Sequence, residues 1–291
     1  MSGSNRSGVL LTVLAASLFA VAGVVAADLF KVMEPAKVAQ LRSVGAALIC
    51  IVIALIRRQG GHRGQLWKLA TLGGLIALVT VCYYIAIDRL GVGPGVTIEF
   101  TAPILVLAYT AVIQRRHVPL GAWVAAGVAL AGVSLITKVW EAESLDPVGL
   151  AAGAAAAVTF AAYLLLTSHL GQRLPSLTIA AYGLGFSALL YLAFAGPPTL
   201  PTSTRIWLEL AWVIVLGTVV PFFLEILALR RTSPGVVGVA ASIEPVVAAL
   251  VAWLWLDQSV TAGQAVGIGL VVIGVAVIQL RTAPSAPNLP A

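Results

Sequence analysis

The sequence contains little charge, little histidine and almost no cysteine. Only 10% of its 291 residues are Asp, Glu, Lys or Arg, whereas soluble domains carry about 25%. Both cysteines, Cys50 and Cys82, fall inside apolar runs, so we expect packing roles and neither a disulfide framework nor a metal site. All three histidines fall at predicted loops, and the chain lacks an HExxH motif. Nothing in the sequence indicates a resident metal or cofactor.

Long apolar runs dominate what remains. Hydrophobic residues make up 60% of the chain, and about 20 such residues in a row suffice for a helix to cross a hydrocarbon core of about 30 Å. The pattern predicts an all-α integral membrane protein with ten transmembrane helices. The expected spans are 8–27, 36–56, 67–87, 93–113, 119–137, 148–168, 177–195, 207–229, 234–256 and 262–280.

The segments outside these spans are short and polar. The first run is longer than the about 7 to 15 apolar residues of a cleaved signal peptide, so we interpret it as the first transmembrane helix. The C-terminal residues 282–291 are rich in proline, and we expect them to be disordered. No piece is large enough for a separate soluble domain, so any chemistry is expected within the bilayer.

The charged residues predict the orientation, because Lys and Arg accumulate in cytoplasmic loops. With ten spans, one side collects eleven cations and no acid, and the other collects five cations and eight acids. We therefore predict a multi-pass protein of the bacterial inner membrane with both termini cytoplasmic. This topology also accounts for the net charge of +6, so no nucleic-acid partner is expected. The eleven cations are Arg6, Arg57, Arg58, Arg63, Lys68, Arg115, Arg116, Arg173, Arg230, Arg231 and Arg281.

The two halves of the chain resemble each other. The segment GAWVAAGVALAGV (121–133) aligns without a gap on GQAVGIGLVVIGV (263–275) at an offset of 142, which also relates Pro103 to Pro245. The pair Pro94-Gly95 recurs as Pro234-Gly235 at an offset of 140. The change of offset from 140 to 142 predicts a two-residue insertion. Five helices in each half would make the repeats inverted, an arrangement typical of alternating-access transporters. The predicted repeats are 8–138 and 148–281.

Glu99 is an acid inside the fourth span, within the segment GVTIEFTAP. A charged side chain near the bilayer centre costs about 2.5 to 3.5 kcal/mol on insertion scales and marks a functional site by default. Pro103 lacks the N–H that would bond the Glu99 carbonyl, so a helix kink is expected there. The site could bind an ammonium, a water or a cation. A protonated glutamate bonded to a neighbouring helix, or half of a structural ion pair, remains the alternative.

Glu244 repeats this pattern in the ninth span, immediately before Pro245, where a second kink is expected. Glu99, Glu225 and Glu244 are candidates for proton coupling or gating. Glu225 precedes Arg230 and Arg231 by about one turn, so pairing with that loop or snorkelling is the alternative. Arg42, in the outer part of the second span, is interpreted as binding a substrate carboxylate, neutralising Glu99, or snorkelling.

Three segments carry a family resemblance: YYIAIDRLGVGPGVTIEFTAP (83–103), AAYLLLTSHLGQR (161–173) and FFLEILALRRTSPGVVGVAASIEP (222–245). With them the chain resembles EamA-type carriers of the drug/metabolite transporter superfamily, and within it the threonine and homoserine exporters. The resemblance implies two inverted EamA repeats and a central cavity for small metabolites. It also implies that Tyr83 or Tyr84, Tyr163, Arg42, Glu99 and Glu244 line the binding site.

We therefore expect a secondary transporter that exports small metabolites, such as amino acids, by alternating access, with a zwitterionic substrate and possible proton coupling. A monomer or a weak homodimer would suffice. Export of drugs, nucleobases or other metabolites is the alternative. Three buried acids against one arginine disfavour a sugar-phosphate or nucleotide-sugar carrier. An intramembrane enzyme is disfavoured because the spans contain no paired aspartates and no Ser/His pair.

Overall fold

The computed structural model describes residues 2–58, 63–141, 146–194, 196, 200–256 and 259–281. The predicted tail at 282–291 and the loop positions His62, Glu143 and Asp257 lie outside these described residues. Throughout the described part the secondary structure is helical. Its α-helices are α1 (Ser2–Leu29), α2 (Pro35–Ile56), α3 (Leu66–Leu90), α4 (Val92–Glu99), α5 (Ala102–Val112), α6 (Leu120–Thr137), α7 (Pro147–Gly171), α8 (Ser176–Phe194), α9 (Thr204–Ile214), α10 (Val220–Leu229), α11 (Pro234–Ala241), α12 (Ile243–Leu256) and α13 (Ala262–Arg281).

The prediction of ten membrane-spanning helices is confirmed. Ten segments of the described chain are long and apolar enough to cross a bilayer. Seven of them are single helices, and three are composite: α4 with α5, α9 with α10, and α11 with α12. The bounds agree with the predicted spans to within a few residues, and the largest difference is at α1, which begins at Ser2. Cys50 and Cys82 are both buried free thiols, as expected for packing residues.

Two of the composite spans break where the sequence predicts a kink. Helix α4 ends at Glu99 and α5 begins at Ala102, while α11 ends at Ala241 and α12 begins at Ile243. The first break lies before Pro103, where the Thr101 hydroxyl donates to the Ile98 carbonyl at 2.6 Å. That bond satisfies a carbonyl near the end of α4, as a backbone group in lipid requires.

The third composite span contains a break that the sequence analysis missed. A π-helical turn, η3 (Val215–Val219), joins α9 to α10. Pro221 follows it and cannot donate to the carbonyl four residues earlier, and π-turns commonly form at such interruptions. The Thr218 hydroxyl donates to the Val213 carbonyl, five residues back, at 2.9 Å.

The helix bounds repeat along the chain. Adding 142 to the bounds of α4 (Val92–Glu99) gives those of α11 (Pro234–Ala241), and adding 142 to the first residue of α6, Leu120, gives the first of α13, Ala262. The predicted two-residue insertion is therefore wrong. The Pro-Gly pair is instead displaced by two positions within the first turns of an otherwise matching helix.

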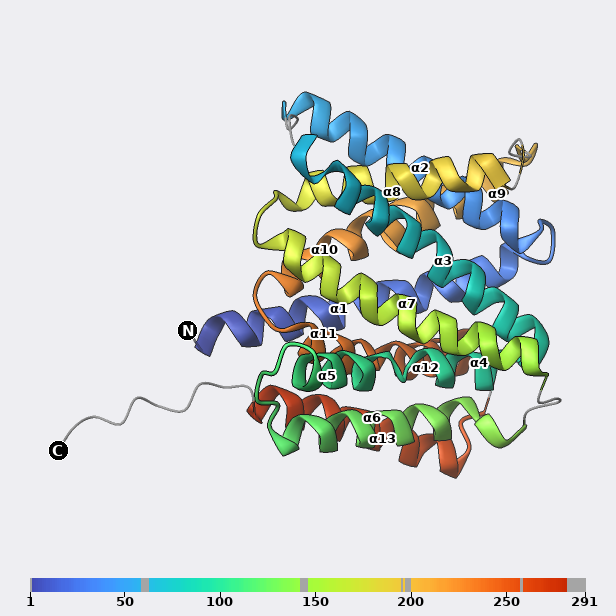
Figure 1. Cartoon of the computed structure of the whole chain (residues 1–291). Helices are drawn as coiled ribbons and strands as arrows, with labels where there is room; N and C mark the ends of the chain where they lie inside the picture. Colours follow the sequence, from blue (N-terminus) through green and yellow to red (C-terminus); the bar gives the residue numbers. More distant parts are fainter. Residues whose placement is uncertain are drawn as a thin grey trace.

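The packing of the helices follows the same symmetry. Helix α3 packs against α7, and its counterpart span α9–α10 packs against α1, the counterpart of α7. The pairs α2 with α8 and α6 with α13 each join a helix to its own counterpart. In Figure 1, α6 and α13 lie together at one edge of the bundle, with α2 and α8 toward the opposite edge. Helices α4, α5, α11 and α12 lie between these edges.

Glycines permit the closest of these contacts. A Cβ added to Gly132 on α6 would lie 2.6 Å from the Gly267 carbonyl oxygen on α13. The offset of 142 maps this pair onto Gly274 and Ala125, and a Cβ on Gly274 would lie 2.8 Å from the Ala125 carbonyl oxygen. Small residues let membrane helices approach in this way. The two contacts are thus symmetry-related copies of each other.

Candidate functional site

The two helix breaks place Glu99 and Glu244 near each other. Glu99 is the last residue of α4, and Glu244 lies in the first turn of α12. Their carboxyl groups interact electrostatically, and Tyr83 of α3 interacts with both. Close packing of the two broken spans brings this about: Gly238 of α11 lies against Pro103, so that an added Cβ would be 3.2 Å from the Pro103 Cγ.

The local backbone adds to the charge at Glu99. The C-terminal end of a helix carries unpaired carbonyls and a partial negative charge, and Glu99 puts a carboxyl at that end of α4. A cation or an ammonium group is therefore the favoured partner of this end. Glu244, at the N-terminal end of α12, is favourably placed with respect to its own helix.

Glu225 belongs to the same group of acids. It is only 6% exposed, it interacts electrostatically with Glu244, and the Tyr163 hydroxyl donates to its Oε2 at 2.8 Å. The bond joins α7 to α10 across 62 residues of sequence. Arg230, the expected loop partner, instead donates from Nη1 to the Leu174 carbonyl at 3.0 Å. Glu225 therefore bonds Tyr163, and Arg230 bonds the Leu174 carbonyl instead of Glu225.

Aromatic rings enclose the Tyr163–Glu225 pair. Tyr163 stacks on Phe160 with ring centroids 6.1 Å apart and meets Phe222 edge to face at 6.0 Å. Phe19 of α1 meets Phe222 at 5.6 Å. Phe19 and Phe160 were missed by the sequence analysis. The spacing of Phe160 and Tyr163, one helical turn apart, could have indicated the first contact, whereas no local pattern points to Phe19.

Arg42 lies on α2 and has no acid of the group in direct contact. Its charge acts on Glu244 and on Tyr191 of α8, and among the described residues no carboxylate lies within 4.0 Å of it. Its Nε is buried without a hydrogen-bond partner in the described chain. A buried donor without an acceptor is costly. Arg42 thus offers an N–H to a further acceptor, and direct neutralisation of Glu99 is not observed.

The arrangement combines three acids, one arginine and two tyrosines contributed by six spans. Neighbouring carboxylates in a low-dielectric medium repel each other when both are charged, so a shared proton or a bound cation stabilises them. The group can therefore hold an ammonium at Glu99 and Glu244, and it can exchange a proton. Arg42 adds a donor suited to a carboxylate.

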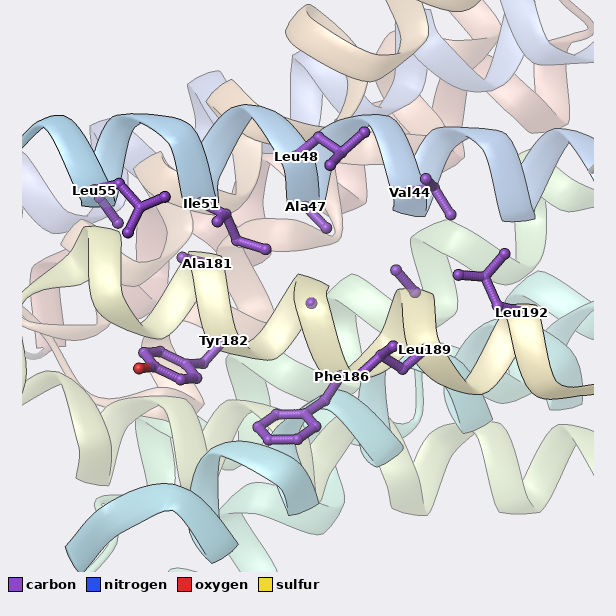
Figure 2. A pocket seen from close by; sticks show the side chains of 13 residues that line it. Val44, Ala47, Leu48, Ile51, Leu55, Ala181, Tyr182, Phe186, Leu189 and Leu192 are labelled. Carbon is purple, nitrogen blue, oxygen red and sulfur yellow. The ribbon is translucent and has the colours of Figure 1, made fainter. Parts of the chain in front are cut away.

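A cavity elsewhere in the bundle is apolar and lacks the charged groups of this site. An apolar cavity of about 460 Å³ lies between α2 and α8, and Figure 2 shows Ile51 and Leu48 on one side of it and Tyr182 and Phe186 on the other. Apart from the Tyr182 hydroxyl, the described residues that line it include no ionisable side chain. This cavity is unsuited to a charged or zwitterionic molecule.

Comparison with known proteins identifies the class. The model of the EamA-like transporter family matches residues 6–138 and 147–280. The chain belongs to the EamA-like transporter family, and it is a membrane transporter with two copies of the EamA domain. A solved crystal structure with 19% sequence identity has a TM-score of 0.78 and covers 97% of this chain and 99% of the other, which shows the same fold.

Several curated relatives are similar along most of the chain. Protein PecM of Dickeya dadantii is 27% identical over 84% of both chains. Threonine/homoserine exporter RhtA of Escherichia coli K12 is 27% identical over 85% of this chain and 82% of its own. Pseudopaline exporter CntI of Pseudomonas aeruginosa is 26% identical over 94% of this chain and 96% of its own.

Proposed function

We propose that this transporter exports amino acids or similar zwitterionic metabolites by alternating access. The observation that carries the proposal is the meeting of Glu99, Glu225 and Glu244 from three broken spans in one electrostatically coupled group. Acids in this position suit a cationic amino group, and the names of the curated relatives RhtA and CntI describe exporters. Orientation with both termini in the cytoplasm follows from the eleven cations on that side.

In this proposal Glu99 and Glu244 accept hydrogen bonds from the substrate ammonium, with Tyr83 beside them. Arg42, whose Nε lacks a partner in the described chain, donates to the substrate carboxylate. Glu225, bonded to Tyr163, responds to charge at Glu244 and participates in gating or proton transfer. The inverted repeats supply the two conformations, since each half can adopt the arrangement that the other leaves.

The kinks support this mechanism physically. A break at Glu99 and another next to Glu244 allow the halves of each span to tilt separately, because the backbone bonds that would join them are missing. Tilting changes which end of the bundle reaches the acids. Pro103 and Pro245 are therefore proposed as the helix-kink residues of the transport cycle.

Efflux from proteoliposomes tests the proposal. Vesicles loaded with labelled threonine, homoserine and a panel of other amino acids are compared for the native protein and for Glu99→Gln and Glu244→Gln. We expect both variants to lose at least about tenfold in efflux rate, as the loss of a charge-assisted contact implies. Glu34→Gln, which removes an acid from the exposed connection before α2, is the matched control and should transport normally.

Two outcomes would contradict the proposal. Unchanged efflux in both variants would remove Glu99 and Glu244 from the site. Efflux of nucleobases or other uncharged compounds without efflux of any amino acid would favour the alternative cargo. Repeating the measurement across an imposed pH gradient separates proton coupling from uniport or exchange, since only a coupled carrier would be driven by the gradient.

A further inference from the structure

A second and larger cavity lies on the outer side of α10. Its volume is about 1000 Å³, and its walls come from the C-terminal part of α2, the connection between α7 and α8, and the face of η3 and α10 that carries Val220, Phe223 and Leu227. Successive side chains of an α-helix are rotated by about 100° around the helix axis. Glu225 therefore lies on the face of α10 opposite to Val220, Phe223 and Leu227. The cavity, which we call the basic groove, is therefore separate from the group of acids.

Arginines gather at one end of the basic groove. Arg57 follows α2, Arg173 lies between α7 and α8, and Arg230 and Arg231 follow α10. All four are exposed, and among the described residues no Asp or Glu lines the groove. The bond from Arg230 Nη1 to the Leu174 carbonyl fixes one guanidinium at the rim. The charge of this end is complementary to a phosphate, which guanidinium groups bind through several hydrogen bonds.

The rest of the groove is apolar and reaches into the membrane. Its lining extends along η3 and α10 from Arg231 back to Val219, a helical path of about 18 Å at about 1.5 Å per residue. That length is close to one half of a hydrocarbon core of about 30 Å. Ile53 and Phe223 face this space from opposite helices and are 39% and 38% exposed. A groove with one charged end and an apolar length of one leaflet matches an amphiphile better than a small ion.

We propose that the basic groove binds one anionic phospholipid of the leaflet at the arginine end. Its phosphate lies among Arg57, Arg173 and Arg231, and one acyl chain lies along α10 between Ile53 and Phe223. Basic pockets between transmembrane helices recognise anionic headgroups in this way. The proposal is independent of the transported substrate. It places a lipid on the helix whose opposite face holds Glu225.

The arginines have a simpler explanation that the experiment must exclude. Cations at helix C-termini stabilise the helix dipole, and cations on one side orient the protein. Both explanations apply equally to Arg115 and Arg116, which follow α5 at the same end of the bundle and are also exposed. Neither residue lines the basic groove. The pair Arg115 and Arg116 is therefore a matched control of equal charge.

Native mass spectrometry of the full-length protein in detergent tests the proposal. The protein is titrated with phosphatidylglycerol and, separately, with phosphatidylcholine. We expect one phosphatidylglycerol to bind at least about tenfold more tightly than phosphatidylcholine, because only the former leaves a net negative charge for the arginines. Arg57→Gln with Arg173→Gln should remove that preference, while Arg115→Gln with Arg116→Gln should keep it.

The apolar wall is tested without changing charge. Ile53→Trp fills the groove beside α10 and should weaken phosphatidylglycerol binding several-fold. Val112→Trp, at an exposed site at the end of α5, should leave it unchanged. Equal unfolding temperatures of the two variants would show that any loss of binding is not a loss of folding.

Three results would overturn the proposal. Equal affinity for phosphatidylglycerol and phosphatidylcholine would remove the headgroup recognition. Equal loss in the two double-arginine variants would reduce the effect to general charge at that face. Displacement of the bound lipid by millimolar inorganic phosphate would make the groove a site for a free anion.

Discussion

The Tyr163 hydroxyl and Glu225 Oε2 are 2.8 Å apart, and this hydrogen bond connects α7 of the second repeat with α10 in the composite eighth span. Both side chains are buried. Tyr163 belongs to an aromatic wall that we define as Phe19, Phe160, Tyr163 and Phe222, and Glu225 belongs to the group of acids. The bond fixes one carboxylate oxygen of Glu225, whose charge acts on Glu244. Its strength and its effect on transport can be measured separately.

A double-mutant cycle measures the strength of this bond. Tyr163→Phe, which removes the donor, Glu225→Leu, which removes the acceptor, and the double variant are unfolded in mixed micelles. Hydrogen bonds between membrane helices average about 0.6 kcal/mol in such cycles and reach about 1.7 kcal/mol, so we expect a coupling energy in that range. A coupling energy of zero would mean that the two side chains act independently. Efflux assays on Tyr163→Phe should show a slower rate with the substrate affinity retained.

Arg42 is expected to recognise a carboxylate. Replacing Arg42 by Gln should raise the KM for an amino acid by about tenfold or more, since one charge-assisted hydrogen bond is lost. The KM for the corresponding amine, which lacks the carboxylate, should stay the same. Arg58→Gln, at an exposed position after α2, is the control. Equal effects on the amino acid and on the amine would place Arg42 outside the substrate site.

The contact between α6 and α13 predicts a symmetric pattern of glycine substitutions. Gly132→Ala and Gly274→Ala put a methyl group 2.6 Å and 2.8 Å from a backbone carbonyl of the facing helix, and such overpacking costs about 1 to 3 kcal/mol. Gly127→Ala and Gly269→Ala meet nothing within 4 Å. These controls should not destabilise the protein, and because Ala favours a helix over Gly they should raise the free energy of unfolding by up to about 1 kcal/mol.

The unfolding free energies of these glycine variants also test whether the two repeats pack as equivalent copies. If only one of Gly132→Ala and Gly274→Ala is destabilising, the two halves do not pack as equivalent copies at this contact. If the controls are as destabilising as the tested variants, the effect comes from the helix itself and not from the close approach.

An ion-pair group at the end of the bundle away from the termini predicts a pH dependence. Arg205, in the first turn of α9, bonds Asp28 Oδ2 at 2.7 Å, and Lys31 bonds Asp28 Oδ1 at 2.9 Å. The hydrogen bond from Lys31 and the two positive charges hold the pKa of Asp28 below its ordinary value of 3.8. The charged form is favoured in the folded state, so its contribution to stability is present above pH 3.8 and disappears as the pH falls through the lowered pKa.

The unfolding temperatures of the native protein and of Asp28→Asn, measured against pH, check this sign. The native protein should be the more stable of the two at neutral pH, and the difference should shrink as the pH falls below 3.8. The effect should be small, because the group is exposed and screened by salt. A difference that grows toward acidic pH would contradict the assignment.

Much of the fold and part of the site could be predicted from the sequence. The ten spans follow from local hydropathy, since a bilayer admits only segments of sufficient apolar length. The repeat appears in GAWVAAGVALAGV and its copy at an offset of 142. The acids Glu99 and Glu244 stand out because a charge in an apolar helix is costly, and Pro103 and Pro245 mark the neighbouring backbone breaks.

The contacts between side chains of different helices were decided only by the tertiary structure, because they depend on how each helix is rotated and packed against its neighbours. The partner of Glu225 is Tyr163, 62 residues away, and not the nearby Arg230. The charge of Arg42 acts on Glu244, Phe19 joins the aromatic wall, and the basic groove forms between α2 and α10. Hydropathy and spacing are properties of one helix, whereas these contacts arise where faces of different helices meet, so the sequence supplies the groups and the packing selects which of them interact.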